Sequence, residues 1–418
     1  MNRAPLTAAL TSLILAVGCG PVPPPGQLVS SSKQRITQAA PEADTAATVD
    51  ANTTFALDLY RSLGDGNVVF SPYSITTALA MTYGGAKGDT AKAFEATLHI
   101  ALPADRFHRT MNTLDAALQS RGQGAQGKDG KPFRLAVTNQ LFSQKGFSLV
   151  PDFLDLLATE YGSGVSLLDF GKDPESSRAA INGWISASTQ NLIPELLAKG
   201  SITDLTRLVL VNTIYFNAAW ATKFKAEDTH DGSFTLTDGS KATVKMMNGE
   251  LSGAHGTLDG TDVVELPYDG GEVSMVLLAP PAGKLADLER DLTAAKLQRY
   301  VAALSSGSFA MSLPKFDFKL HVDLGEKLSR LGLAQAFTDA ADFSGMTTSE
   351  PLYISSVVHE AVIRTDEAGT EAAAATAVVM AGRSAISETV TVDRPFLFVV
   401  RDVKTGSVVF LGRVVDPR

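Results

Sequence analysis

Apolar residues divide the chain into a short N-terminal stretch and a long globular region. The stretch from about residue 5 to residue 18 is mostly apolar, but fourteen residues are too few for a helix that spans a bilayer. It is typical of the core of a signal peptide, so residues 1–18 are predicted to be one. From about Asp50 onward the pattern is globular, and Phe55, Leu59 and Leu63 recur at helical spacing. We therefore expect one large domain at residues 50–418.

Helices are predicted mainly in the first part of this domain and strands in the last. Ser71 before Pro72 predicts an N-cap with proline in the first turn, and Gly84 and Gly85 end that helix. A second helix is predicted at 174–190. Strands are predicted at 135–142, 207–216, 273–279, 309–313, 352–358, 396–401 and 407–413. The expected fold class is α+β, without internal repeats.

Composition excludes several classes of function. The 418 residues carry a formal net charge of −9 and no run dense in Lys or Arg, so no nucleic-acid partner is expected. The six histidines show no metal-ligand spacing, and no metal or cofactor is predicted. The single cysteine, Cys19, excludes an intrachain disulfide.

The position of Cys19 suggests a lipid anchor. Residues 15–19 (Leu-Ala-Val-Gly-Cys) resemble the bacterial lipobox, although Ala16 stands where leucine is commonest. The alternative is an ordinary cleaved signal peptide with a chance cysteine. Residues 19–49 contain few large apolar side chains, and we expect a disordered tether there. The chain is thus predicted to be exported, and either lipid-anchored at the cell envelope or secreted, with the lipid as its only membrane contact.

The familiar signatures of enzymes are missing. There is no His-Glu-x-x-His, Gly-x-Ser-x-Gly or Cys-x-x-Cys motif. Residues 85–90 (Gly-Ala-Lys-Gly-Asp-Thr) have the wrong order for a phosphate-binding loop and predict a turn between helices. The chain is therefore not expected to be an enzyme.

One segment does not match its surroundings. Residues 371–375 (Glu-Ala-Ala-Ala-Ala) taken alone favour a helix, because alanine is the best helix former. The residues on both sides favour extended structure. Small side chains could also enter between two strands, where the backbone would be paired on both edges. From Gly369 to Arg383 an extended chain would reach about 46 Å, enough for a full central strand.

This segment resembles the reactive-centre loop of the serpins. Their hinge pattern, Glu-x-Gly-Thr-Glu-Ala-Ala-Ala-Ala-Thr, is matched by Glu367, Gly369, Thr370, Glu371, Ala372, Ala373, Ala374, Ala375 and Thr376. Further matches occur in the same order at residues 70–75, 85–90, 211–220, 358–361, 393–398 and 409–414. The resemblance covers roughly residues 50–418. It implies the serpin fold, with helices packed on three β-sheets, a large central sheet and an exposed reactive-centre loop at about 367–390.

The resemblance also implies a mechanism. In serpins a target protease attacks the loop and forms an acyl-enzyme, and the cut loop then inserts into the central sheet as a new strand. Four positions match the family's shutter, a polar cluster beneath the strands that must part: Ser71, Ser74, Asn212 and His359. Trp220 matches the breach, where insertion begins. Plain core packing is the alternative explanation for His359 and Trp220.

Counting from the hinge locates the bond that would be cut. In the family this bond lies fourteen residues beyond the hinge glycine, which is Arg383–Ser384 here. Arginine suits the acidic pocket of trypsin-like proteases. The predicted function is suicide-substrate inhibition by a monomer whose partner is a serine protease held as a covalent acyl complex. The alternatives are a non-inhibitory serpin that binds a ligand or partner, and an inhibitor of cysteine proteases.

Overall fold

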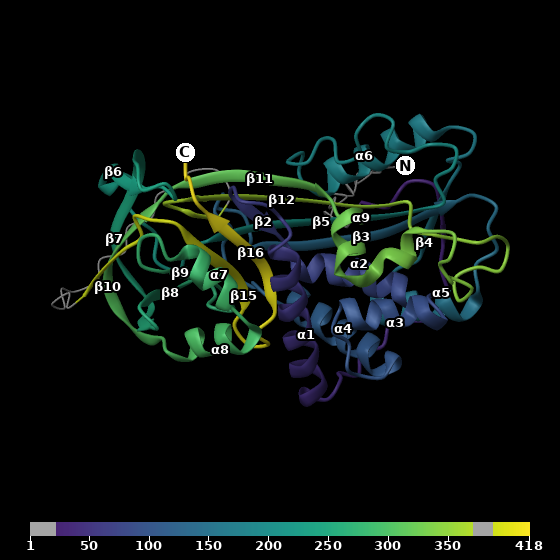
Figure 1. Ribbon diagram of the computed structural model, residues 1–418, viewed down its shortest axis with the longest axis horizontal. Helices are drawn as coiled ribbons and strands as arrows, with labels where there is room; N and C mark the ends of the chain where they lie inside the picture. The colour runs from purple at the N-terminus through teal and green to yellow at the C-terminus, as the bar shows by residue number, and fades with distance from the viewer. Residues whose placement is uncertain (1–21, 371–387) are drawn as a thin grey trace, which may run out of the picture.

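The computed structural model describes residues 22–370 and 388–418 (Figure 1). The helices are α1 (Glu42–Tyr60), α2 (Pro72–Tyr83), α3 (Gly88–Thr97), α4 (Ala104–Gln119), α5 (Pro151–Tyr161), α6 (Pro174–Ser188), α7 (Leu285–Asp291), α8 (Ala294–Ala302) and α9 (Gly325–Leu328). The strands are β1 (Gln27–Val29), β2 (Val68–Phe70), β3 (Arg134–Gln144), β4 (Val165–Leu168), β5 (Leu208–Ala219), β6 (His230–Thr235), β7 (Lys241–Leu258), β8 (Thr261–Pro267), β9 (Val273–Ala279), β10 (Ser305–Pro314), β11 (Phe316–Asp323), β12 (Ser356–Asp366), β13 (Gly369–Thr370), β14 (Thr389–Thr391), β15 (Phe396–Asp402) and β16 (Val408–Val414).

Helix α2 begins as the sequence predicts. The Ser71 hydroxyl accepts a hydrogen bond from the backbone N–H of Ser74 at 3.2 Å, and Pro72 occupies the first turn. The helix ends at Gly84. All of its residues are buried, because the helix packs against β3, β5 and β16. The predicted helix at 174–190 is α6. Of the turn predicted at 85–90, residues 85–87 join α2 to α3, whereas residues 88–90 already form the first turn of α3.

A seven-stranded sheet crosses the molecule in the order β1-β4-β3-β5-β13-β12-β11. Strand β5 is buried along its whole length, and successive side chains face opposite layers. Its even-numbered apolar residues, such as Leu210, pack in the main core with α1 and α2. Its odd-numbered ones, such as Val211, pack with Trp184 of α6 on the other face. The sheet therefore has helices on both faces, with α6 on the upper one in this view (Figure 1).

The remaining strands form a second sheet of nine, in the order β14-β10-β7-β8-β9-β15-β16-β2, with β6 also paired to β7. The 18-residue strand β7 pairs with β6 at its start (241–246), with β10 along its middle (246–255) and with β8 at its end (254–258). The α+β class is confirmed. The described residues contain two hydrogen-bonded sheets rather than the three expected. Strands that would otherwise form two smaller sheets are joined into one, because β7 pairs with β6, β8 and β10.

The expected disordered tether at residues 19–49 is wrong for the part that is described, which starts at residue 22. Strand β1 pairs with β4, and α1 already begins at Glu42. Between them, Arg35 donates hydrogen bonds to Asn112 at 2.7 Å and to Asp115 at 2.6 Å. Polar contacts with distant helices stabilise this segment, so its low content of large apolar side chains did not predict its structure.

Candidate functional site

The end of β12 turns back into the sheet through residues 367–370, which we call the hinge segment. Its last two residues form β13 between β5 and β12. Gly369 pairs with Ala219 on one side and with Asp366 on the other. Thr370 occupies the next position, between Ala218 and Thr365. The hinge segment thus begins a new strand in the middle of the central sheet.

Gly369 is required where it stands. Its φ is +148°, a conformation that L-residues with side chains rarely adopt, and an added Cβ would lie 2.2 Å from the Ala218 carbonyl oxygen. The backbone can therefore approach β5 closely only because position 369 lacks a side chain.

Two stacked aromatic side chains, Trp220 and Tyr268, make hydrogen bonds around the hinge segment. The Trp220 backbone N–H donates to the Ala368 carbonyl at 3.0 Å, and its indole N–H donates to the Asp366 carbonyl at 2.9 Å. The indole ring stacks on Tyr268, with the ring centres 4.6 Å apart and an interplanar angle of 8°. The Tyr268 hydroxyl lies 2.8 Å from the Thr370 hydroxyl. Trp220 therefore contacts the point at which β13 enters the sheet.

Ion pairs fix the two adjacent acidic residues at the start of this turn, Asp366 and Glu367. Lys315 Nζ lies 2.8 Å from Glu367, whose carboxylate also accepts a hydrogen bond from the Thr229 hydroxyl at 2.7 Å. Partial burial alone would raise the Glu367 pKa, but these two donors outweigh it and hold the pKa below its usual value. Lys128 Nζ lies 2.6 Å from Asp366.

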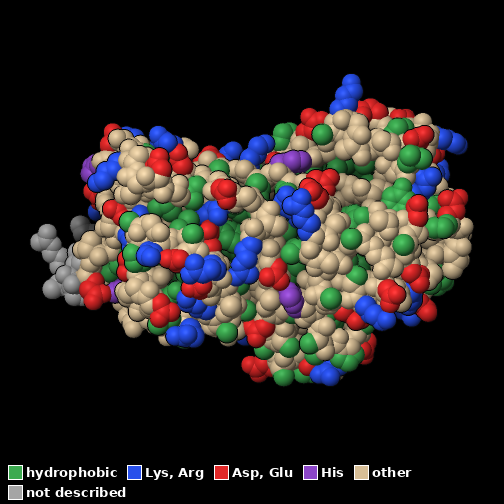
Figure 2. Space-filling model, viewed as in Figure 1, with side chains coloured by type: hydrophobic (Ala, Val, Ile, Leu, Met, Phe, Trp, Pro, Cys, Tyr) green, Lys and Arg blue, Asp and Glu red, His purple; other side chains and the backbone are tan. Residues whose placement is uncertain are grey.

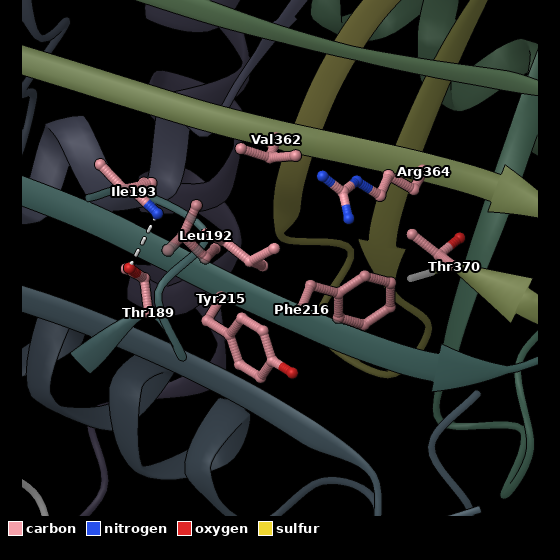
Figure 3. A pocket seen from close by; sticks show the side chains of 9 residues that line it. Thr189, Leu192, Ile193, Tyr215, Phe216, Val362, Arg364 and Thr370 are labelled. Atoms are coloured by element: carbon pink, nitrogen blue, oxygen red, sulfur yellow. Dashed lines mark hydrogen bonds between the residues drawn. The ribbon is translucent and has the colours of Figure 1, made fainter. Parts of the chain in front are cut away.

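Between Thr370 and the first direct pair of β5 with β12, these two strands are not hydrogen-bonded to each other over a short stretch. The two strands pair directly, in parallel, only from Val209 with Ser356 to Thr213 with Glu360. Between that stretch and β13 lies a small cavity with room for about one water molecule. Figure 3 shows Tyr215 and Phe216 from β5, Val362 and Arg364 from β12, and Thr370 at the right, near Phe216 and Arg364. Its lining also includes Thr189, Leu192 and Ile193 from the segment after α6.

Where β5 and β12 meet directly, the structure brings together all four residues predicted for the shutter. His359 lies opposite Asn212 in the parallel register, and its Nδ1 is 2.7 Å from Asn212 Oδ1. The Ser71 backbone N–H donates to His359 Nε2 at 3.1 Å. Because Nε2 accepts, Nδ1 carries the proton and donates to Asn212. The Asn212 amide group in turn donates to the hydroxyl of Ser74 and to Asn139.

Burial controls the charge of this network, which we call the shutter cluster (Ser71, Ser74, Asn139, Asn212 and His359). Burial lowers the pKa of His359 to about 3, with a smaller contribution from His321 nearby. The imidazole is therefore neutral at neutral pH and acts as one donor and one acceptor. The cluster connects α2, β3, β5 and β12 through hydrogen bonds alone.

Sequence reasoning missed several residues of the site. Asn139 gave a weak signal as an amide in a predicted strand, and Tyr268, Asp366, Lys315 and Lys128 gave none before the fold was known. The other predicted site residues lie outside the described residues: Cys19, Glu371, Ala372, Ala373, Ala374, Ala375, Thr376, Arg383 and Ser384. Their assigned roles stay predictions.

Charged side chains of both signs are mixed on the visible face, and the described residues offer no cluster of metal ligands. Lys and Arg side chains alternate with Asp and Glu over the face shown in Figure 2, without a large region of one sign. Within residues 22–370 and 388–418, no group of three or more His, Cys, Asp or Glu side chains could hold a metal ion. In the same ranges, no helix is long and apolar enough to cross a bilayer.

Comparison with known proteins agrees with the geometry of the hinge segment and the sheet. The family model "Serpin (serine protease inhibitor)" matches residues 50–417. The chain is similar to the leukocyte elastase inhibitor of Bos taurus, with 38% identity over 381 residues, which cover 88% of this chain and 98% of that protein. Among solved structures, it resembles the thermophilic serpin tengpin in its native state, with a TM-score of 0.82, 26% identity, and coverage of 93% and 100% of the two chains. It also resembles uncleaved ovalbumin, with a TM-score of 0.80, 26% identity, and coverage of 89% and 100%.

Proposed function

Because the chain belongs to the serpin family of serine protease inhibitors and not to a family of enzymes, we propose that it traps trypsin-like proteases through Arg383–Ser384. The observation that best supports inhibition is β13. Gly369 and Thr370 already occupy a strand position between β5 and β12, immediately above the stretch where these strands are apart. After Glu371, residues 372–377 are all alanine or threonine, so they could continue this strand.

The covalent chemistry would be that of the protease. Its serine hydroxyl attacks the Arg383 carbonyl carbon, the Arg383–Ser384 C–N bond breaks, and Ser384 leaves as a free amine that takes up one proton. Arg383 stays esterified to the protease. The loop, now free at its cut end, could then continue the register of β13 and carry the bound protease along the sheet.

Strand formation supplies the driving force. About ten residues that pair on both sides would form some ten to twenty backbone hydrogen bonds, each worth about 0.5–1.5 kcal/mol net. The gain is therefore on the order of 10 kcal/mol. For this, β5 and β12 must separate at the shutter cluster, where Asn212 and His359 now bond to each other.

The choice of target rests on one side chain. Arginine before the cut favours proteases with an acidic pocket, through charge-assisted hydrogen bonds. The similarity to leukocyte elastase inhibitors favours an elastase-type enzyme as a second candidate. These two possibilities predict different cut positions in the loop.

The test is incubation with trypsin, elastase and subtilisin, followed by denaturing gels and mass spectrometry. We expect an SDS-resistant complex with trypsin and a released C-terminal peptide that starts at Ser384. Cleavage by all three proteases without any stable complex would contradict inhibition, and a different peptide start would reassign the bond. Heating the protein before and after loop cleavage provides a second readout, because insertion should raise the thermal midpoint.

We also propose that the protein is exported and lipid-anchored through Cys19. The support is the lipobox-like sequence at residues 15–19. The test compares the natural chain with Cys19→Ser in cells fed labelled palmitate. Label in both proteins, or in neither, would contradict the anchor.

A further inference from the structure

A lysine from outside the central sheet touches both strands that border the hinge segment. Lys128 belongs to the loop between α4 and β3. Its backbone N–H donates to the Asn217 side chain of β5 at 2.8 Å, and its Nζ lies 2.6 Å from Asp366 of β12. At this level Gly369 of β13 separates the two strands. Lys128 thus connects β5 to β12 across the entering strand.

The loop that presents Lys128 is held tightly against β5. Its Gln126 carbonyl accepts from the Ala219 N–H at 3.1 Å, and the Gln126 N–H donates to Asp269 at 2.7 Å. Gly127 is packed so closely that an added Cβ would lie 2.5 Å from Asn217 Oδ1. The loop therefore holds the lysine in one position relative to β5.

Burial makes the ion pair with Asp366 strong. The Lys128 side chain is only 2% exposed, and Asp366 is 28% exposed. A lysine so buried is costly unless it is paired and hydrogen-bonded, and breaking such a pair costs more than breaking an exposed one. Asp366 is also the residue whose carbonyl accepts from Trp220, and its carboxylate accepts from the Ala368 N–H at 3.0 Å. The pair therefore fixes the turn from which β13 starts.

The same lysine borders the next position that an inserting strand would fill. Thr370 lies opposite Ala218 and Thr365, so the position after it lies between Asn217 and Arg364. Lys128 orients the first of these side chains directly, through its backbone N–H.

We propose that Lys128 is a positioning residue for loop insertion. It keeps Gly369 and Thr370 seated between β5 and β12, so that insertion starts from a formed strand as soon as the loop is cut. Without this bridge the hinge segment can leave the sheet, and insertion must begin by forming the strand. Hydrolysis of the acyl-enzyme then competes better with trapping. This inference rests on the proposed inhibitory function, but the seating of the hinge segment can be tested without it.

The first experiment measures backbone hydrogen exchange of peptides that cover residues 363–370. Lys128→Met keeps the length of the side chain and removes its charge. We expect exchange to be on the order of tenfold faster, as the loss of a charge-assisted bond predicts. Lys131→Met is the matched control, because this lysine lies in the same loop with a side chain that is 73% exposed. Lys128→Arg should restore most of the protection.

The second experiment measures how many moles of inhibitor are consumed per mole of trypsin trapped. We expect a rise of at least about threefold for Lys128→Met, no change for Lys131→Met and a value near that of the natural chain for Lys128→Arg. A fold defect alone would not be rescued selectively by a cation. If Lys128→Met does not fold, Asp366→Asn removes the charge from the other partner and should give the same two results.

The outcomes separate the two proposals. If exchange at 363–370 is the same in Lys128→Met and Lys131→Met, the bridge does not seat the hinge segment, whatever the inhibition data show. If exchange rises but consumption of inhibitor does not, the positioning role in trapping is wrong. If the natural chain forms no complex with any protease, the proposed function fails, while the exchange data still decide whether Lys128 seats the hinge segment.

Discussion

Replacing His359 by glutamine should flatten the dependence of stability on pH. In the folded protein burial lowers the His359 pKa from 6.5 to about 3. Between these values the unfolded chain binds a proton that the folded chain does not. Stability from the neutral imidazole is therefore fully present above pH 6.5 and is lost as the pH falls toward 3. Glutamine keeps one donor and one acceptor for Asn212 and Ser71 but cannot take up a proton in this range.

The size of the effect follows from the two pKa values. At about 1.4 kcal/mol per unit, lowering the pH from 7 to 5 should cost the natural chain about 2 kcal/mol through His359. His108 is also buried, and its pKa is lowered to about 4, which adds a loss of about the same size. The His359→Gln variant should therefore lose about 2 kcal/mol less than the natural chain over this interval, even if it is less stable at pH 7.

The assay is denaturant unfolding at a series of pH values from 7 to 5. His230→Gln serves as the matched control, because His230 is exposed on β6 and lies outside the shutter cluster. NMR of protein labelled with ¹⁵N at histidine gives an independent readout, and the His359 ring should keep its proton on Nδ1 at pH 5. The reasoning is refuted if His359→Gln and His230→Gln show the same pH dependence, or if the His359 ring becomes charged above pH 5.

Three further changes probe the hinge segment and the N-terminal segment. Thr370→Arg places a guanidinium at a buried position, where the 3% exposed Thr370 contacts the Tyr268 hydroxyl. Denaturing gels should show that trypsin cleaves this variant without forming an SDS-resistant complex. An undiminished complex would contradict loop insertion. Glu367→Lys replaces the ion pair with Lys315 by two like charges, which destabilises the hinge segment. Native gels after mild heating should then show a loss of the monomer band. Glu367→Gln should show a smaller loss. Deleting residues 22–36 removes β1 and the Arg35–Asp115 pair; calorimetry should find a thermal midpoint several degrees lower, whereas an inert tether would leave it unchanged.

Features of the fold that depend on neighbouring residues could be predicted from the sequence. The start of α2 follows from Ser71 and Pro72, and β5 follows from a long apolar run. The N-terminal segment could not be predicted, because Arg35 meets Asn112 and Asp115 only after α4 has folded. Strand β13 is two residues long, and its pairing depends on the ends of two other strands. Such contacts leave no local pattern.

The registers of the sheet also locate where insertion meets resistance. Asn212 lies six positions before Ala218 on β5, and His359 lies six positions before Thr365 on β12. A strand that continues β13 therefore reaches the level of the shutter cluster six residues past Thr370. Direct pairing of β5 with β12 ends at Thr213 and Glu360, so the first four positions past Thr370 break no bonds between the two strands. One position beyond that pair, the strand must also replace the bond between Asn212 and His359. The cost of separating this pair, rather than the seating of the hinge segment, should determine how far the loop enters before it is cut.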